Sequence, residues 1–184
     1  MIPCVLTMGK FESIHRGHQV LIASVVAEAR RLQIDAVLLA FEPHPYRVLH
    51  DANYVPLLTS DIRTQIVQKL GIDRVVHFPF DEALIQLSPQ AFCERLFHEL
   101  HPEVIIVGEG YRFGKNREGT IETLKILAAA HNIIVQVIPT QQYDYAEKIS
   151  TSYIRTLIKD GAYTSAEKLL GFPIDLVTTT LYNG

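Results

Sequence analysis

Short apolar runs alternate along this chain with longer stretches whose apolar positions recur every three to four residues. The runs at 5–8, 36–41, 74–78, 104–107 and 133–138 predict five β-strands. The longer stretches predict helices at 17–32, 60–70, 89–100, 120–130, 151–159 and 165–170. Residues 43–58 hold three prolines and no clean period, which predicts a long loop.

Strands that are apolar throughout, with a helix between each pair, are typical of a parallel sheet buried on both faces. We therefore predict an α/β fold with about five parallel strands and helices on both faces of the sheet. Ligands in such folds bind beyond the carboxyl ends of the strands. This rule directs attention to the loops that follow Met8, Phe41, Val107 and Ile138.

The composition suits one globular domain. The chain has 184 residues, of which 48% are hydrophobic, and its net charge of -3 offers no broad basic surface, so no nucleic-acid partner is expected. No apolar run approaches the roughly 18 residues of a membrane span, and no secretory signal opens the chain, so we expect no membrane partner and a cytoplasmic protein. Cys4 and Cys93 stand apart among apolar neighbours and are expected to be buried thiols.

The loop after the first strand carries the strongest chemical pattern, the sequence GKFESIHRGH at 9–18. His15 and His18 lie three residues apart where a helix begins, so both rings can face one ligand. The unpaired N–H groups of a helix start suit phosphate, and Gly9 and Gly17 permit close approach. The stretch is neither a P-loop nor a GxGxxG motif. Either histidine alone could be structural; the pair favours a functional site.

A second cluster, KISTSYIR at 148–155, opens the helix at 151–159. The hydroxyls of Ser150, Thr151 and Ser152 could simply cap that helix. Arg155 lies one turn further on, and its planar guanidinium suits phosphate oxygens. By itself this cluster does not decide between a cap and a phosphate site.

Two further loops complete the candidate site. The stretch GEGYRFGKNREG at 108–119 is either a solvated crossover or a loop that covers a ligand, on whose ring Tyr111 or Phe113 could stack. The stretch FEPHP at 41–45 is either a plain strand exit or a rigid apolar wall, because its two prolines stiffen it.

Together these four clusters resemble the N-terminal, adenylyl-transferring half of bacterial bifunctional riboflavin kinase/FAD synthetases. That family has GxFDGxHxGH where this chain has GKFESIHRGH, FxPxP where it has FEPHP, VGxDFRFG where it has VGEGYRFG, and ISSTxIR where it has ISTSYIR. The likeness covers residues 4 to about 173, and the ordered set is far more specific than any one motif.

The resemblance implies a Rossmann-like nucleotidyltransferase fold of the HxGH superfamily, with strand order 3-2-1-4-5. It implies transfer of AMP from ATP to FMN, giving FAD and pyrophosphate, with Mg²⁺ on the phosphates and FMN as substrate. The implied catalytic residues are His15, His18 and Arg155. ATP would lie over Gly9, Phe11, Gly17, Ser150, Thr151 and Ser152. The loops around the flavin and nucleotide would supply Phe41, Pro43, Pro45, Gly108, Arg112 and Phe113.

Three positions depart from the family pattern, and they leave alternatives open. Glu12 and Ser13 replace the family's Asp-Gly, so a longer acid must fit and glycine's freedom at positive φ is lost; Gly110 replaces an acid. A catalytically degenerate flavin or nucleotide binder, or an HxGH transferase with another phosphorylated acceptor, is therefore the alternative to an FMN adenylyltransferase.

We expect residues 1–173 to form the transferase domain. The tail at 174–184, which is strand-like over 174–182, is expected to be the start of a missing riboflavin kinase domain. A riboflavin kinase, fused or separate, is an expected partner. This chain itself should not phosphorylate riboflavin.

Overall fold

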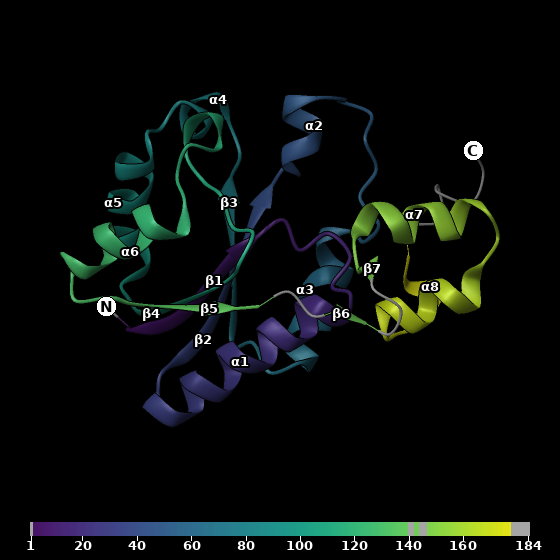
Figure 1. The fold of residues 1–184 in the computed structure, drawn as a ribbon, viewed down its shortest axis with the longest axis horizontal. Coiled ribbons are helices and arrows are strands. Elements are labelled where there is room, and N and C mark those ends of the chain that lie inside the picture. Colours follow the sequence, from purple (N-terminus) through teal and green to yellow (C-terminus); the bar gives the residue numbers. More distant parts are fainter. Residues whose placement is uncertain (1, 140–141, 144–146, 178–184) are drawn as a thin grey trace.

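The structure is a computed structural model of the whole chain, and it describes residues 2–139, 142–143 and 147–177. Its centre is a parallel five-stranded sheet in the order β3-β2-β1-β4-β5 (Figure 1). The strands are β1 (Cys4–Gly9), β2 (Asp35–Glu42), β3 (Arg74–Pro79), β4 (Pro102–Gly108) and β5 (Ile134–Ile138). The predicted α/β class and the strand order implied by the resemblance are both confirmed.

Helices cover both faces of the sheet (Figure 1). They are α1 (Arg16–Leu32), α2 (Pro45–Leu49), α3 (Ser60–Lys69), α4 (Glu82–Ile85), α5 (Pro89–Leu100), α6 (Ile121–Ala129), α7 (Thr151–Lys159) and α8 (Tyr163–Leu170). Alternate residues of β1 enter opposite cores, as the two-residue period of a strand requires: Leu6 packs with residues of α5 and α6, and Val5 with residues of α1 and α3. Apolar burial on both faces drives this layered arrangement.

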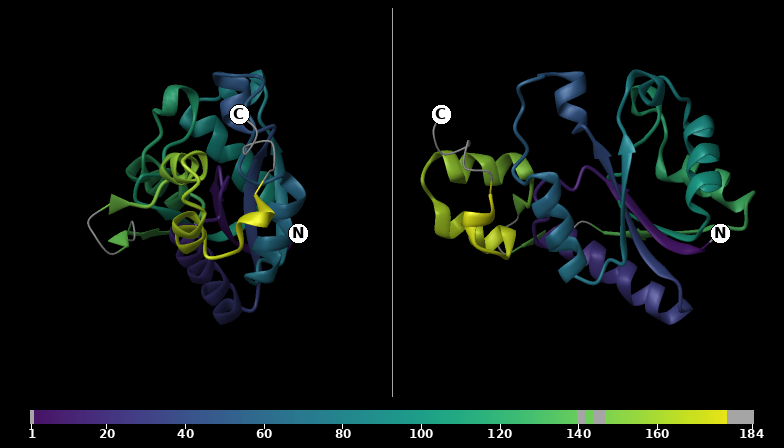
Figure 2. Two further views of the ribbon diagram at one scale, coloured as in Figure 1. Left: turned by 90° about the vertical axis from the view of Figure 1, so that its right-hand side faces the viewer. Right: turned by 180° about the vertical axis from the view of Figure 1, so that it is seen from behind.

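A third, smaller core joins α7 and α8. It contains Leu57, from the segment before α3, together with Ile154 and Leu170 of the two helices. Figures 1 and 2 show this helix pair at the end of the molecule farthest from α5 and α6. The side chain of Gln19 on α1 donates to the Leu170 carbonyl at 2.6 Å, which ties the pair to the start of α1.

Side-chain caps explain where most of the predicted helices begin. Thr59, Ser88, Thr120 and Ser150 each accept the backbone N–H three residues ahead, at the starts of α3, α5, α6 and α7. The predicted boundaries of these four helices agree with the structure to within about two residues.

Two sequence expectations were wrong. The stretch 43–58 is not loop throughout, because Pro45 begins the short helix α2, where a proline at the first helical position costs no hydrogen bond. The tail is not a strand where it is described, since Ile174–Leu176 forms a 3₁₀ turn (η2) packed beside α8; residues 178–184 of that tail lie outside the described residues. Sequence reasoning also did not anticipate α4, the 3₁₀ turn Lys115–Arg117 or the paired strands β6 (Gln142–Tyr143) and β7 (Glu147–Lys148).

Cys4 and Cys93 are free, buried thiols, as predicted. Burial raises the pKa of Cys4 to about 11 and that of Cys93 to about 12, so both stay protonated and act as small apolar groups. None of the helices among the described residues is long and apolar enough to span a membrane.

Candidate active site

The carboxyl ends of the central strands meet the start of α1 at one cavity. Strand order reverses between β1 and β4, which is where open α/β sheets bind ligands. The cavity has a volume of about 270 Å³, near the lower end for ligand sites. Its lining comprises Met8, Gly9, Phe11, His15, Gly17, His18, Leu21, Gly108, Glu109, Gly110, Tyr111, Ile138, Pro139 and Ile149.

His15 begins α1 and is held in one tautomer. Its Nδ1 accepts the backbone N–H of His18 at 3.3 Å, so the neutral ring carries its proton on Nε2. The residue is 9% exposed, and burial lowers the pKa of His15 to about 4. At neutral pH His15 is therefore an uncharged side chain that can donate one hydrogen bond from Nε2.

His18 stacks against His15 on the cavity wall. The ring centroids are 3.9 Å apart with 19° between the planes, and Phe11 packs at 5.3 Å from His18. Burial, followed by the neighbouring His15, lowers the pKa of His18 well below its usual range. Its Nδ1 is buried without a hydrogen bond to any described residue. Two neutral, stacked imidazoles thus face a cavity that can take up an anionic group.

We expect acid to destabilise the fold through its buried histidines. The pKa of His15 and the pKa of His44 are each lowered to about 4 by burial, against 6.5 for an exposed histidine. The unfolded chain binds more protons between those values, so stability falls as pH falls through that window. From about pH 7.5 to about pH 5.5, each histidine should cost about 1 kcal/mol. Urea unfolding of wild type and His44→Asn at both pH values measures this; equal pH dependence would contradict it.

Glycines shape the floor of the cavity. A Cβ atom at Gly17 would stand 3.1 Å from the His15 ring, so Gly17 lets that ring keep its position. Gly108 and Gly110 differ, because a Cβ at either position would meet no protein atom within 4 Å. The space where the family carries an acid, at Gly110, is therefore open in this chain.

We predict that Gly108→Val separates ligand binding from folding. A Cβ atom at this position would meet no protein atom within 4 Å, and the added side chain would take up space at the end of β4, where Gly108 lines the cavity. Stability should therefore change little, while ligand affinity falls about tenfold or more. The matched control is Gly114→Ala, where φ is +70° and a Cβ would lie 2.9 Å from Pro89; it should lose stability. Gly108→Val with undiminished affinity for every cavity ligand would show that the space is not a binding site.

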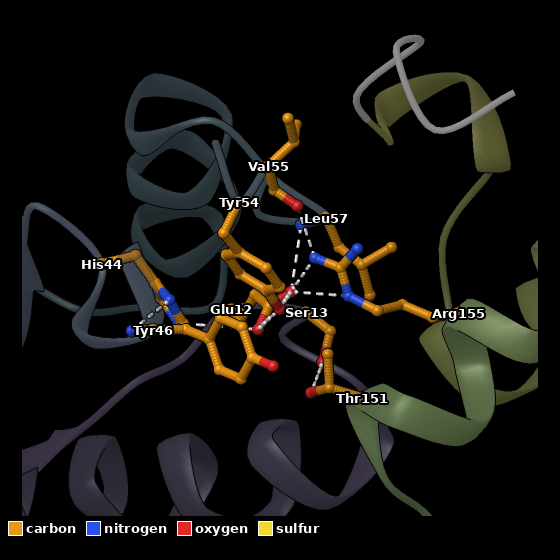
Figure 3. Close-up of polar contacts among 9 residues, drawn as sticks. All are labelled: Glu12, Ser13, His44, Tyr46, Tyr54, Val55, Leu57, Thr151 and Arg155. Atoms are coloured by element: carbon orange, nitrogen blue, oxygen red, sulfur yellow. Dashed lines mark hydrogen bonds and ion pairs between the residues drawn. The ribbon is translucent and has the colours of Figure 1, made fainter. Parts of the chain in front are cut away.

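Glu12 is the centre of a buried polar cluster beside the cavity (Figure 3). Both carboxylate oxygens lie 2.8 Å from the Tyr54 hydroxyl, which donates to them, and the Leu57 N–H donates at 3.2 Å. Arg155 donates from Nε at 3.1 Å and also from Nη2. We call Glu12, Tyr54, Leu57 and Arg155 the Glu12 clasp. It joins three segments that are far apart in the sequence.

Arg155 has further partners within this region. Its Nη2 also donates to the carbonyl of Val55, and its guanidinium carbon lies 4.5 Å from the centre of the Tyr54 ring. His44 stacks on the opposite side of the clasp, 5.3 Å from Tyr54, with Nε2 3.5 Å from a Glu12 oxygen. Since His44 is uncharged at neutral pH, Arg155 is the charged partner of Glu12.

The start of α7 lies next to the same loop. The Ser13 and Thr151 hydroxyls are 2.9 Å apart, and Ser150 caps the helix by accepting the Tyr153 N–H at 3.2 Å. Ser152 is exposed. Ser13 does not need the positive φ expected there, because the positive values fall on Phe11 (44°) and Ile14 (43°) instead. Such strained backbone in non-glycine residues is often found at functional sites.

The structure brings together part of the predicted site. Six predicted residues line the cavity: Gly9, Phe11, His15, Gly17, His18 and Gly108. The remaining predicted residues are not in its lining. Arg155 is in the clasp, and Ser150, Thr151 and Ser152 open α7 next to it.

Apart from Gly108, the residues predicted for the flavin and nucleotide loops lie outside this lining. Phe113 is buried against Phe92, with centroids 5.6 Å apart, so it belongs to the core. Phe41 packs on Phe80 at 5.3 Å, and Arg112 is exposed. Pro43 is exposed and Pro45 is buried at the start of α2. Of the two aromatics considered for stacking on a ring, Tyr111 reaches the cavity.

Sequence reasoning missed residues that carry no local signal. Tyr54 lies in an irregular stretch and becomes notable only through its contacts with Glu12 and Arg155. Burial raises the pKa of Tyr54, so its phenol remains a donor. Ile149 and Leu21 were readable only as apolar positions, although both line the cavity.

The donor set bears on how a metal ion could be held. The described residues do not gather three or more His, Cys, Asp or Glu side chains at one point. Glu12 is already engaged, and Glu109 supplies the carboxylate among the described lining residues. Mg²⁺ retains several waters and binds mainly through phosphates in many nucleotide sites. This donor set therefore fits Mg²⁺ that arrives with a nucleotide.

Comparison with known proteins decides the family. A family model described as FAD synthetase matches residues 1–153. The chain belongs to the FAD synthetase family. Among curated relatives, a bifunctional riboflavin kinase/FMN adenylyltransferase of Buchnera aphidicola is 31% identical over 173 residues, covering 93% of this chain and 55% of the relative. An FAD synthetase of Listeria monocytogenes is 29% identical over 171 residues, covering 92% and 69%.

The comparisons also concern the length of this chain and its fold. This FAD synthetase-family chain covers 55% of the Buchnera relative and 57% of a bifunctional riboflavin kinase/FMN adenylyltransferase of Listeria monocytogenes, so it spans about half the length of these bifunctional proteins. A crystal structure described as a macrolide-efflux protein from Streptococcus pneumoniae superposes with a TM-score of 0.84 at 27% identity, covering 94% of this chain and 56% of that one. The likeness supports the arrangement of sheet and helices described above.

Proposed function

We propose that this chain transfers AMP from ATP to FMN, giving FAD and pyrophosphate. One observation carries the proposal: two neutral, stacked histidines at the start of α1 line a cavity at the reversal of strand order, in a chain of the FAD synthetase family. The reaction needs hydrogen-bond donors beside a phosphate, and the tautomer of His15 supplies one such donor.

In this reaction an oxygen of the FMN phosphate attacks the α-phosphorus of ATP, and pyrophosphate leaves in line. The attacking oxygen is already anionic, so the chain needs no strong base. Its task is to position two anions and to stabilise the charge that develops on the α-phosphate. Hydrogen bonds from His15 and His18 to the α-phosphate oxygens would strengthen as that charge grows.

The surrounding residues divide between the two substrates. Gly9, Phe11 and Gly17 would lie against ATP, and Ser150, Thr151 and Ser152 at the start of α7 would meet its phosphates. The flavin would lie toward Gly108 and the loops that carry Phe41, Pro43, Pro45, Arg112 and Phe113. Mg²⁺ bound to the phosphates would reduce the repulsion between the two anions, with Glu109 available to its waters.

The test is to incubate the chain with FMN, ATP and Mg²⁺ and to separate the flavins by chromatography. We expect FAD and pyrophosphate in equal amounts. Riboflavin should not be converted, because it lacks the phosphate that acts as the nucleophile. Binding of ATP and FMN without formation of FAD would favour a catalytically degenerate binder. The departures from the family pattern at Glu12, Ser13 and Gly110 are the reason to consider that alternative. Turnover of another phosphorylated acceptor in place of FMN would move the chain to a different HxGH transferase.

A further inference from the structure

The Glu12 clasp places the guanidinium of Arg155 on a carboxylate of the same chain. The Glu12 side chain is 7% exposed and that of Arg155 is 24% exposed. Removing either partner would leave the other charge without its counter-ion, and for Glu12 that charge is buried. Breaking such a pair costs far more than forming it gains, because desolvation is no longer offset. Release of Arg155 to bind a phosphate would therefore be strongly opposed by Glu12.

The other neighbours of Glu12 cannot replace that counter-ion at neutral pH. Tyr54 and the Leu57 N–H are neutral donors. His44 has Nε2 3.5 Å away, and its Nδ1 accepts the Tyr46 N–H at 3.2 Å, which is the cap of α2. A second proton on His44 would have to occupy Nδ1 and would displace that cap. Arg155 is thus the charged partner that holds the Glu12 carboxylate in place.

The contacts of the clasp lie between two segments that the proposed function assigns to substrates. On one side, Tyr54 and Leu57 belong to the segment that runs on from the 41–45 stretch, and Tyr46 of α2 packs 4.4 Å from Tyr54. On the other side, Arg155 lies one turn along α7 from Ser150. Glu12 itself follows Phe11, a lining residue of the cavity. The buried Glu12 carboxylate, which belongs to the first loop, therefore contacts both the segment that follows the proposed flavin loop at 41–45 and the helix that begins at the proposed phosphate site.

We propose that Glu12 is a positioning residue, which with Arg155 as its counter-ion fixes the flavin-side segment relative to the start of α7. Arg155 then acts on the substrates through Glu12 and does not bind phosphate itself. This inference rests on the proposed function, because it takes the two segments to be substrate sites. It assigns a role to Glu12, at which this chain departs from the family pattern, and to Tyr54.

The first arm of the test does not depend on activity. Urea unfolding midpoints are compared for wild type, Glu12→Gln, Arg155→Gln and the double variant. Each single variant leaves one charge unpaired and should lower the unfolding midpoint. The double variant leaves no unpaired charge, so its midpoint should be no lower than that of the less stable single variant. If the midpoint losses of the two single variants simply add in the double variant, Glu12 and Arg155 are not energetically coupled. Arg31→Gln breaks an exposed pair with Glu28 and should leave the midpoint nearly unchanged.

The second arm measures binding of riboflavin, which has no phosphate, and of ATP in the presence of Mg²⁺. We expect Glu12→Gln and Arg155→Gln each to weaken both ligands at least fivefold, and Arg31→Gln to weaken neither. Tyr54→Phe removes one donor to Glu12 but keeps the ring, so it should fold and should weaken both ligands by a smaller factor. A role in folding alone would leave affinities of the folded protein unchanged.

Two results would contradict the proposal in different ways. If Arg155→Gln weakens ATP alone and Glu12→Gln leaves ATP binding unchanged or tighter, Arg155 is a phosphate ligand and Glu12 its competitor. If wild type binds neither riboflavin nor ATP, the proposed function fails, and the positioning role fails with it. The urea series would still show in that case whether Glu12 and Arg155 are energetically coupled.

Discussion

His18→Ala should lower kcat for FAD formation by about a hundredfold or more, equivalent to about 3 kcal/mol of transition-state stabilisation. The imidazole lines the cavity beside His15, and its hydrogen bond to the α-phosphate would strengthen only as charge develops there. ATP affinity should change much less than kcat, because the ground state has less charge at that oxygen. Steady-state kinetics with FMN, together with calorimetric ATP binding, separates the two effects.

The controls use other histidines of the same chain. His15→Ala should act in the same direction, since its Nε2–H is aligned by the bond between Nδ1 and the His18 N–H. His98 on α5 is exposed and does not line the cavity, so His98→Ala should keep wild-type turnover. Full turnover in His18→Ala would remove His18 from the proposed mechanism.

Arg155→Ala should lower the free energy of unfolding by about 3 kcal/mol or more at neutral pH. The change removes the two donors that Arg155 offers to Glu12 and the contact with the Val55 carbonyl. It leaves a carboxylate that is 7% exposed without a cation. Arg155→Lys keeps the charge but not the planar fork that reaches two acceptors, so we expect a smaller but clear loss. Urea unfolding with a linear extrapolation measures both.

A surface pair provides the comparison for Arg155. Arg31 lies 2.7 Å from Glu28, but its side chain is 64% exposed, so Arg31→Ala should cost less than about 1 kcal/mol. If Arg155→Ala and Arg31→Ala destabilise the protein equally, the clasp is a solvated contact and its buried charge is not the reason for any functional effect.

The sequence by itself determined the fold class and the position of the cavity. Five apolar runs separated by helical stretches are typical of a covered parallel sheet. The predicted starts of four helices agree with the structure, in which Thr59, Ser88, Thr120 and Ser150 cap them. The loop at 9–18 was identifiable because a strand end, two glycines and two histidines follow one another directly. These are local or periodic signals, which one chain can show without any partner segment.

Only the tertiary structure showed which groups Arg155 contacts. The sequence predicts that Arg155 binds phosphate, because a cation near a helix start suits an anion, and that role stays a prediction. In the structure Arg155 contacts Glu12, Val55 and Tyr54, which lie 143, 100 and 101 residues earlier in the chain. The sequence also did not show which aromatic residue of the loop at 108–119 reaches the cavity. In the structure Phe113 packs in the core and Tyr111 lines the cavity. Which acceptor a buried charge finds depends on segments brought together by folding, and no local pattern around Arg155 or Glu12 contains that information.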